Sequence, residues 1–228
     1  MTQVFLEMTM TVDGFVTAPG MSREHPLGVG GERVHEWILG LFGPEPTPTG
    51  IIPEQATGTV ASPEQVDRLI AARIFNRTGA FVMTRRTFEA GEQLWGERTV
   101  FGLRPCFVVT DRPRDPIVRG RSRFEFVTHG VREAIRRAGV AASAAPVTVL
   151  GNATIAREAL LGDLVDELRL HLVPVLLGTG DRLFPEVQSP PVELELLRVE
   201  RGARATHLRY RIIRHDRRRG GVRASAQS

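Results

Sequence analysis

Apolar and polar residues alternate along residues 4–12, and this period of two predicts a β-strand. The same alternation along residues 167–173 predicts a second strand, with leucines on one side and Glu167, Arg169 and His171 on the other. Because successive side chains of a strand point to opposite faces, the pattern determines which residues share a face of each strand.

Residues 192–200 and 206–214 predict a terminal β-hairpin. Its second strand is expected to bury one set of alternate residues, Leu208, Tyr210 and Ile212. The other set is expected to be exposed to solvent, namely His207, Arg209 and Arg211.

Shorter apolar runs bounded by turn residues predict buried strands at residues 80–83, 105–110, 124–127 and 147–150. Helical spacing of apolar residues predicts helices at residues 32–42, from residue 63, after residue 84, at 130–138 and at 153–161. Ser62 and Pro63 are a typical N-cap and first helical residue. Alternating strands and helices predict a single α/β domain over residues 1–214, with an antiparallel end.

The chain has 228 residues, of which 42% are hydrophobic and 25% are charged, as is usual for soluble globular proteins. No apolar run reaches the roughly 18 residues needed to cross a membrane, and no secretory signal is visible at the N-terminus. The single cysteine, Cys106, lies in an apolar run, where a buried and unreactive thiol is expected. We therefore expect a cytoplasmic protein with no membrane partner.

The net charge of +4 is concentrated at the C-terminus. Residues 214–228 hold five arginines and one aspartate, which account for the whole net charge, so the remainder of the chain is balanced. A neutral body argues against nucleic-acid binding. Residues 215–228 have the composition of a basic, disordered tail.

Polar residues follow three of the predicted strands, in the loops 84–87, 110–112 and 151–154. Ligands of open α/β sheets bind at the carboxyl edge of the strands, where these loops should meet. The first two loops supply arginines and hydroxyls, and the third supplies backbone N–H groups at a helix N-terminus, which suit phosphates. Together they favour a nucleotide ligand, although the third is also compatible with an ordinary turn between a strand and a helix.

Several common sites are not supported by the sequence. No G-x-G-x-x-G follows a predicted strand, and no G-x-S-x-G nucleophile elbow occurs. The histidines show no metal-ligand spacing with carboxylates or with the lone cysteine, so we expect no metal site.

Three segments resemble the dihydrofolate reductase-like family: residues 11–15 (TVDGF), 85–88 (RRTF) and 164–184 (LVDELRLHLVPVLLGTGDRLF). More narrowly, they are similar to stand-alone relatives of the reductase domain of the riboflavin-pathway deaminase–reductase. The resemblance extends from residue 4 to residue 214, and the third segment is its most specific part. It implies a mixed, mostly parallel sheet flanked by helices, NADPH as hydride donor and often a homodimer.

Carried over position by position, the resemblance implies that Thr9 and Val16 line the nicotinamide of NADPH. Thr110 and Arg112 would hold the adenosine 2′-phosphate, which favours NADPH over NADH. Two helix N-termini would contact the other phosphates, through Thr84, Arg85, Arg86 and Thr87 at the first and Gly151, Asn152, Ala153, Thr154 and Ile155 at the second.

The resemblance also implies a substrate position opposite the nicotinamide, closed by the loop 13–31 and the helix 32–42. Asp13 and Trp37 would contact the substrate there. His35 or Glu36 would deliver a proton, with water as an alternative donor, and both side chains are equally compatible with a solvated helix face. The implied reaction is hydride transfer to a C=N or C=C bond of a small, heterocyclic molecule.

Two positions depart from the glycines of the family. The first phosphate loop has Thr84, which we expect to serve as N-cap of the helix at Arg85, and the second loop has Asn152. Leu150 replaces the substrate-binding glutamate of the riboflavin-pathway reductase. The two lost glycines leave open an alternative function, a non-redox descendant of the fold that has lost NADPH binding and binds or transforms a metabolite without it.

Overall fold

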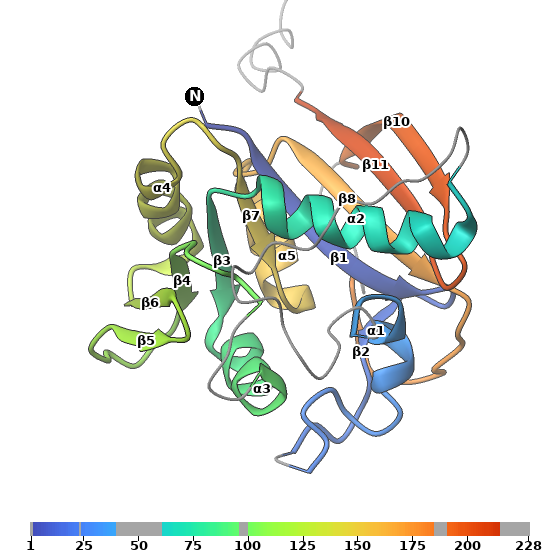
Figure 1. Ribbon diagram of the computed structural model, residues 1–228, viewed down its shortest axis with the longest axis horizontal. Coiled ribbons are helices and arrows are strands. Elements are labelled where there is room, and N and C mark those ends of the chain that lie inside the picture. Colours follow the sequence, from blue (N-terminus) through green and yellow to red (C-terminus); the bar gives the residue numbers. More distant parts are fainter. Residues whose placement is uncertain (1, 23, 40–60, 96–99, 185–190, 215–228) are drawn as a thin grey trace, which may run out of the picture.

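The computed structural model describes residues 2–22, 24–39, 61–95, 100–184 and 191–214. Its large sheet contains β1 (Val4–Thr11), β3 (Ala80–Thr84), β4 (Cys106–Val109), β5 (Ile117–Arg119), β6 (Ser122–Val127), β7 (Val147–Leu150), β8 (Glu167–Val173), β10 (Glu193–Arg201) and β11 (Thr206–Ile213). A small second sheet pairs β2 (Phe15–Thr17) with β9 (Asp181–Arg182). Over the described ranges the large sheet has nine strands in the order β10-β11-β8-β1-β7-β3-β4-β6-β5 (Figure 1).

Strand β1 is central and pairs in parallel with β7 on one side and β8 on the other. Parallel pairing continues through β3, β4 and β6. Antiparallel strands complete both edges, with β11 and β10 at one and β5 at the other. This confirms the predicted α/β fold with its mixed, mostly parallel sheet and antiparallel C-terminal hairpin. The hydrophobic pattern missed β2, β5 and β9 because strands of two or three residues are too short to show alternation.

Helices cover both faces of the sheet, and each face has its own hydrophobic core. On one face lie α4 (Gly130–Ala142) and α5 (Ala153–Leu161), and on the other lie α1 (Glu32–Leu39), α2 (Pro63–Arg77) and α3 (Arg85–Trp95). In Figure 1, α2 runs across β1 and β8. Leu6 of β1 therefore points into the core under α4 and α5, and its neighbour Glu7 points to the face of α2.

Two predicted helix caps are confirmed. At α2, the Ser62 hydroxyl accepts a hydrogen bond from the Gln65 N–H (3.4 Å), and the Gln65 side chain accepts one from the Ser62 N–H (2.7 Å). This reciprocal capping box satisfies two N–H groups that a helix end leaves unpaired. At α3, Thr84 Oγ1 accepts from the Thr87 N–H at 3.3 Å.

One predicted orientation is wrong. His207 was expected to be exposed on the last strand, yet its residue surface is only 3% accessible. Asp67 of α2 and Trp37 of α1 contact its ring, and so they cover this face of the strand. Cys106 is buried as expected.

Parts of four predictions lie outside the described residues: positions 40–42 of the first helix, position 23 of the loop 13–31, the tail 215–228, and positions 1, 23, 40–60, 96–99 and 185–190 of the domain 1–214. Among the described segments, no helix combines the length and hydropathy required to span a membrane.

Candidate active site

A cavity of about 210 Å³ lies on the face covered by α1, α2 and α3, at the carboxyl ends of β1 and β7. Apart from the predicted site residues named below, most of the side chains that line it are apolar, such as those of Phe75 and Leu150. It brings together eight of the predicted site residues, from segments far apart in the sequence: Thr9, Val16, His35, Trp37, Arg86, Thr87, Gly151 and Asn152. The positions predicted for nicotinamide, substrate and phosphates thus share one cavity.

The two positions that depart from the family's glycines are hydrogen-bonded to each other. Asn152 Nδ2 donates to Thr84 Oγ1 at 3.3 Å, and the Thr84 and Thr87 hydroxyls share a hydrogen bond of 2.9 Å. Asn152 Oδ1 also accepts from the Ile155 N–H at 3.3 Å and so caps α5. Each loop therefore uses its own side chain to satisfy one N–H group at the phosphate end of the cavity.

Gly151 has the unusual backbone conformation of the second loop. Its φ is +139°, whereas Asn152 is extended with φ −100°. A Cβ on Gly151 would lie 2.6 Å from Thr87 Oγ1. The glycine is therefore required both by its φ and by the close approach of the β7–α5 loop to the N-terminus of α3.

A second cavity, also of about 210 Å³, gathers cationic residues beside the first turns of α3, on a different side of the helix from the main cavity. Arg85, Thr110 and Arg112 line it together with Arg114, which sequence reasoning missed. Thr110 Oγ1 accepts from the Arg112 N–H at 3.0 Å and orders the loop. The structure thus groups the residues predicted for the 2′-phosphate with an arginine of the first phosphate loop, although Arg85 also pairs with Glu89 at 2.8 Å.

The last three predicted phosphate residues form the first turn of α5 and do not line the main cavity. The side chains of Ala153 and Ile155 are buried in the core, and Thr154 is exposed. The Ile155 N–H of this turn is already bonded to Asn152.

Asp13 and Glu36, predicted for substrate binding and proton transfer, are not among the lining residues of the cavity. Asp13 accepts hydrogen bonds from the Thr11 hydroxyl (2.6 Å) and from the backbone N–H groups of Leu177 (3.0 Å) and Gly178 (2.7 Å). The Thr11 bond, with these N–H donors, lowers the pKa of Asp13 against the opposing effect of burial. Asp13 therefore ties the loop after β1 to the loop after β8.

Glu36 lies on the outer side of α1 and forms ion pairs with Arg204 (3.1 Å) and Arg33 (3.6 Å). Its side chain is 41% accessible to solvent. The sequence could not distinguish this position from that of His35, because adjacent residues of a helix point about 100° apart and the orientation of the helix was unknown. Both side chains thus have structural partners outside the cavity, and their roles in substrate binding and proton transfer stay predictions.

His35 and Trp37 do line the cavity. Burial lowers the pKa of His35 to about 4, so its imidazole is neutral at pH 7 and is a poor proton donor there. The Trp37 indole is 2% accessible, and its Nε1–H donates to Thr9 Oγ1 at 3.1 Å. This bond joins α1 to the central strand and holds the ring in one orientation.

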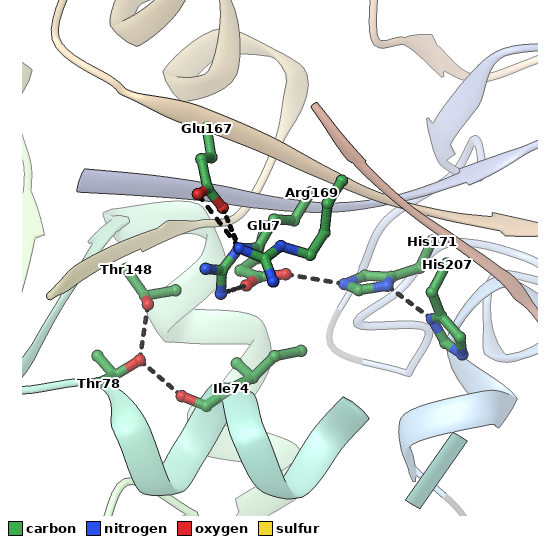
Figure 2. A network of polar contacts seen from close by, with 9 residues as sticks. Glu7, Ile74, Thr78, Thr148, Glu167, Arg169, His171 and His207 are labelled. Atoms are coloured by element: carbon green, nitrogen blue, oxygen red, sulfur yellow. Dashed lines mark hydrogen bonds and ion pairs between the residues drawn. The ribbon is translucent and has the colours of Figure 1, made fainter. Parts of the chain in front are cut away.

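A buried polar network, which the sequence analysis missed, lies beside the cavity. Glu7 Oε2 and His171 Nε2 are 2.9 Å apart, and His171 Nδ1 lies 2.9 Å from His207 Nδ1 (Figure 2). His207 Nε2 lies 2.8 Å from Asp67 Oδ1, and Arg169 donates to Glu7 Oε1 at 3.1 Å. The network links β1, β8, β11 and α2, and Glu7 and His171 also line the cavity.

Burial alone would raise the pKa of Glu7, but the hydrogen bond from His171, together with the hydrogen bond and charge of Arg169, lowers it. Burial lowers the pKa of His171, and Glu7 opposes this effect. Glu7 is therefore ionised at pH 7. A signal for this network exists in the sequence: Glu7 interrupts a strand that a parallel sheet buries on both faces, and a buried carboxylate requires partners.

Comparison with known proteins identifies the fold and the family. The family model of the RibD C-terminal domain matches residues 2–208. A crystal structure described as a riboflavin biosynthesis protein, from Shewanella sp. PV-4, is 20% identical, with a TM-score of 0.58, and the match covers 94% of this chain and 100% of that one. A search of curated proteins gave no match.

Two further solved structures share the fold. A pyrimidine reductase-like protein from Corynebacterium diphtheriae is 13% identical, with a TM-score of 0.54, and the match covers 94% of this chain and 93% of that chain. RibD from Acinetobacter baumannii is 15% identical, with a TM-score of 0.54; the match covers 94% of this chain but 59% of the RibD chain.

Proposed function

Because this chain belongs to the family of the RibD C-terminal domain, we propose that it is a reductase that uses NADPH. Its proposed substrate is a small, heterocyclic molecule that accepts hydride at a C=N or C=C bond. The observation that carries the proposal is the single cavity lined by Thr9 and Val16, at the predicted nicotinamide position, and by Arg86 and Thr87, at the predicted phosphate position.

The donor groups of the second cavity suit the phosphorylated end of NADPH. Guanidinium groups bind phosphates through paired hydrogen bonds, and Arg112 and Arg114 form no ion pair with any carboxylate in the described ranges. The Arg114 guanidinium lies 4.9 Å from the centre of the Phe126 ring, which holds it in place. These two arginines would favour NADPH over NADH.

When bound, NADPH would supply the hydride, and the residues of this chain would orient the substrate and exclude water. Trp37, held by its bond to Thr9, would form a rigid wall for a planar ring. Leu150 and Phe75 would keep the reacting end of the cavity dry. The riboflavin-pathway reductase binds its substrate through a glutamate at the position of Leu150. The proposed substrate of this chain would therefore differ from that of the riboflavin-pathway reductase.

Titration of the purified chain with NADPH and with NADH, by calorimetry, tests the proposal. We expect micromolar affinity for NADPH and at least tenfold weaker binding of NADH. Arg112→Ala should reduce the preference for NADPH over NADH, since it removes a phosphate contact. Arg211 is an exposed arginine of β11, and Arg211→Ala should leave this preference unchanged. No detectable binding of either nucleotide would overturn the proposal.

If NADPH binds, loss of its absorbance identifies the acceptor. The panel should begin with pyrimidines, because one structural neighbour is described as pyrimidine reductase-like.

A specific observation favours the alternative, a non-redox descendant of the fold. Thr84 and Asn152 cap the two helix N-termini and bond to each other, and so they occupy donors that a phosphate would need. Replacing both by glycine, the residue of the family, would open these donors. Nucleotide binding that arises only in the double variant would establish the alternative, and equal binding by both proteins would remove it.

We further propose that the protein is a homodimer formed through its C-terminal hairpin. Leu194, Leu196 and Val199 of β10 are 40%, 54% and 53% accessible, and exposed apolar side chains on a strand at a sheet edge favour association. The mass of the wild-type chain and of Leu196→Glu in solution, measured by analytical ultracentrifugation, tests this proposal. We expect a dimer for the first and a monomer for the second, and a wild-type monomer would refute it.

The cytoplasm is the proposed location of this reductase. NADPH-dependent reductases act where the cofactor is available, and the single cysteine is a free, buried thiol that does not require an oxidising compartment. Fractionation of the native host would test it, and recovery from the extracellular medium would contradict it.

A further inference from the structure

We propose that Glu7, His171, His207 and Asp67 form a proton relay, which stores one exchangeable proton beside the cavity and supplies it to a bound substrate. The delivery step rests on the proposed function, because a reductase must add a proton as well as a hydride. Glu7 and His171 line the cavity, and hydrogen bonds run from them through His207 to Asp67 on α2 (Figure 2 shows the first three).

The stored proton follows from counting hydrogens. Three contacts of 2.8–2.9 Å join the four side chains in series, and each needs one hydrogen between its two heavy atoms. Two ionised carboxylates and two neutral imidazoles contribute only two hydrogens. The intact chain therefore holds a third proton, which makes one imidazole cationic or one carboxyl neutral.

The surrounding charges place this proton. Glu7 is ionised beside Arg169, and burial favours the neutral form of His171. His171 then donates through Nε2 to Glu7, and His207 carries hydrogen on both nitrogens, donating to His171 and to Asp67. The Asp67 carboxylate thus balances the charge of His207, and the Arg204 backbone N–H holds that carboxylate at 2.9 Å.

The other charged groups near the relay are already paired. The elements that pack around the relay contribute to these ion pairs. Arg73 of α2 pairs with Glu200 of β10, and Glu36 of α1 pairs with Arg204. Glu167 of β8 pairs with both Arg169 of β8 and Arg209 of β11. His35 of α1 is neutral at pH 7. Among the described residues, the relay therefore holds a proton that is available beside the cavity.

Trp37 shields the relay, and a further cavity supplies it with protons. The Trp37 ring lies 4.3 Å from the His171 ring and 5.0 Å from the His207 ring, between centroids. A cavity of about 320 Å³ with many charged lining groups also reaches Glu7, His171 and His207. Its size and polarity suit water, so protons can reach the relay from solvent without crossing the substrate cavity.

The reaction balances as follows for a C=N substrate. The carbon accepts a hydride from the reduced nicotinamide and the nitrogen accepts the stored proton through Glu7 and His171, so that the C=N bond becomes a CH–NH bond. The relay is left with two hydrogens in three contacts. Water in the further cavity then returns one proton.

Nitrogen-15 NMR of the histidine rings in the full chain tests the storage without any cofactor. From the hydrogen count we expect His207 to be protonated on both nitrogens and His171 on Nε2 only. Asp67→Asn should leave both rings neutral, because the amide that replaces the carboxylate donates its own hydrogen to the third contact. Two neutral rings in the wild-type chain would overturn the relay.

Turnover of NADPH with the acceptor found above tests the delivery. Glu7→Gln should lower kcat by about 100-fold or more without changing the Kd of NADPH, and Asp67→Asn should also lower kcat without changing this Kd, because it removes the stored proton. Thr148→Val is a matched control, since it removes a buried hydrogen bond to Thr78 on the same face of the sheet but outside the relay. Unchanged kcat in Glu7→Gln and Asp67→Asn would overturn the delivery.

The relay and the proposed function fail in different ways. If none of the acceptors leads the wild-type chain to oxidise NADPH, the reductase is refuted. The NMR result then decides the relay alone. An active reductase whose two rings are neutral at about pH 7 refutes the relay and leaves the reductase intact. If Glu7→Gln does not fold, the wild-type and Asp67→Asn spectra still give the decision.

Discussion

His35 provides a quantitative test of how strongly the cavity excludes water. Burial lowers the pKa of this side chain from 6.5 to about 4, so the folded chain binds its proton at a lower pH than the unfolded chain does. The stability contributed by the neutral ring is therefore complete above pH 6.5 and is lost as the pH falls towards 4.

The perturbation is His35→Gln, which keeps a polar side chain but removes the titration. At about pH 4.5 the medium is about 2 units below the unfolded pKa, which corresponds to about 2.7 kcal/mol at about 1.36 kcal/mol per unit. His35 is half-buried, so solvent screening reduces this value, and we expect about 1.5 kcal/mol. The wild-type chain should lose this much more stability than the variant between about pH 7.5 and about pH 4.5.

Urea unfolding followed by circular dichroism at the two pH values gives the difference directly. The other titrating groups are common to both proteins, so their contributions cancel in the comparison. A difference below about 0.5 kcal/mol would refute the reasoning, because the His35 imidazole would then be as hydrated in the cavity as in the unfolded chain.

Two further predictions concern other parts of the structure. Gly151→Ala should destabilise the chain by about 2–3 kcal/mol, because Gly151 has a positive φ and an added Cβ would lie 2.6 Å from Thr87 Oγ1. Gly139→Ala in α4, where an added Cβ has its nearest contact at 4.0 Å, should stabilise the chain by up to about 1 kcal/mol. A higher melting temperature for Gly151→Ala than for Gly139→Ala, measured by calorimetry, would contradict this. Burial raises the pKa of the Cys106 thiol well above its usual range, so an aromatic disulfide reagent should label it only after unfolding, and rapid labelling of the folded chain would disprove the burial.

The sequence alone determined the elements and the general position of the site. Period-two alternation and short apolar runs located the main strands, and capping residues such as Ser62 and Thr84 marked two helix starts that the structure confirms. Loops that follow parallel strands must meet at one edge of the sheet, so the convergence of residues 86–87 and 151–152 on one cavity was predictable. These features are local or follow from topology, which is why one chain sufficed to derive them.

Only the tertiary structure decided which polar residues are buried and what they contact. Alternation shows that Glu7 and His171 occupy the polar sides of their strands, but it does not show that a helix covers those sides. The covering depends on where α2 crosses the sheet, and this places Asp67 against His207 across 140 residues of sequence. Such pairings are set by packing between distant segments, and the same packing buried two histidines and a glutamate that the pattern by itself placed on the polar sides of strands.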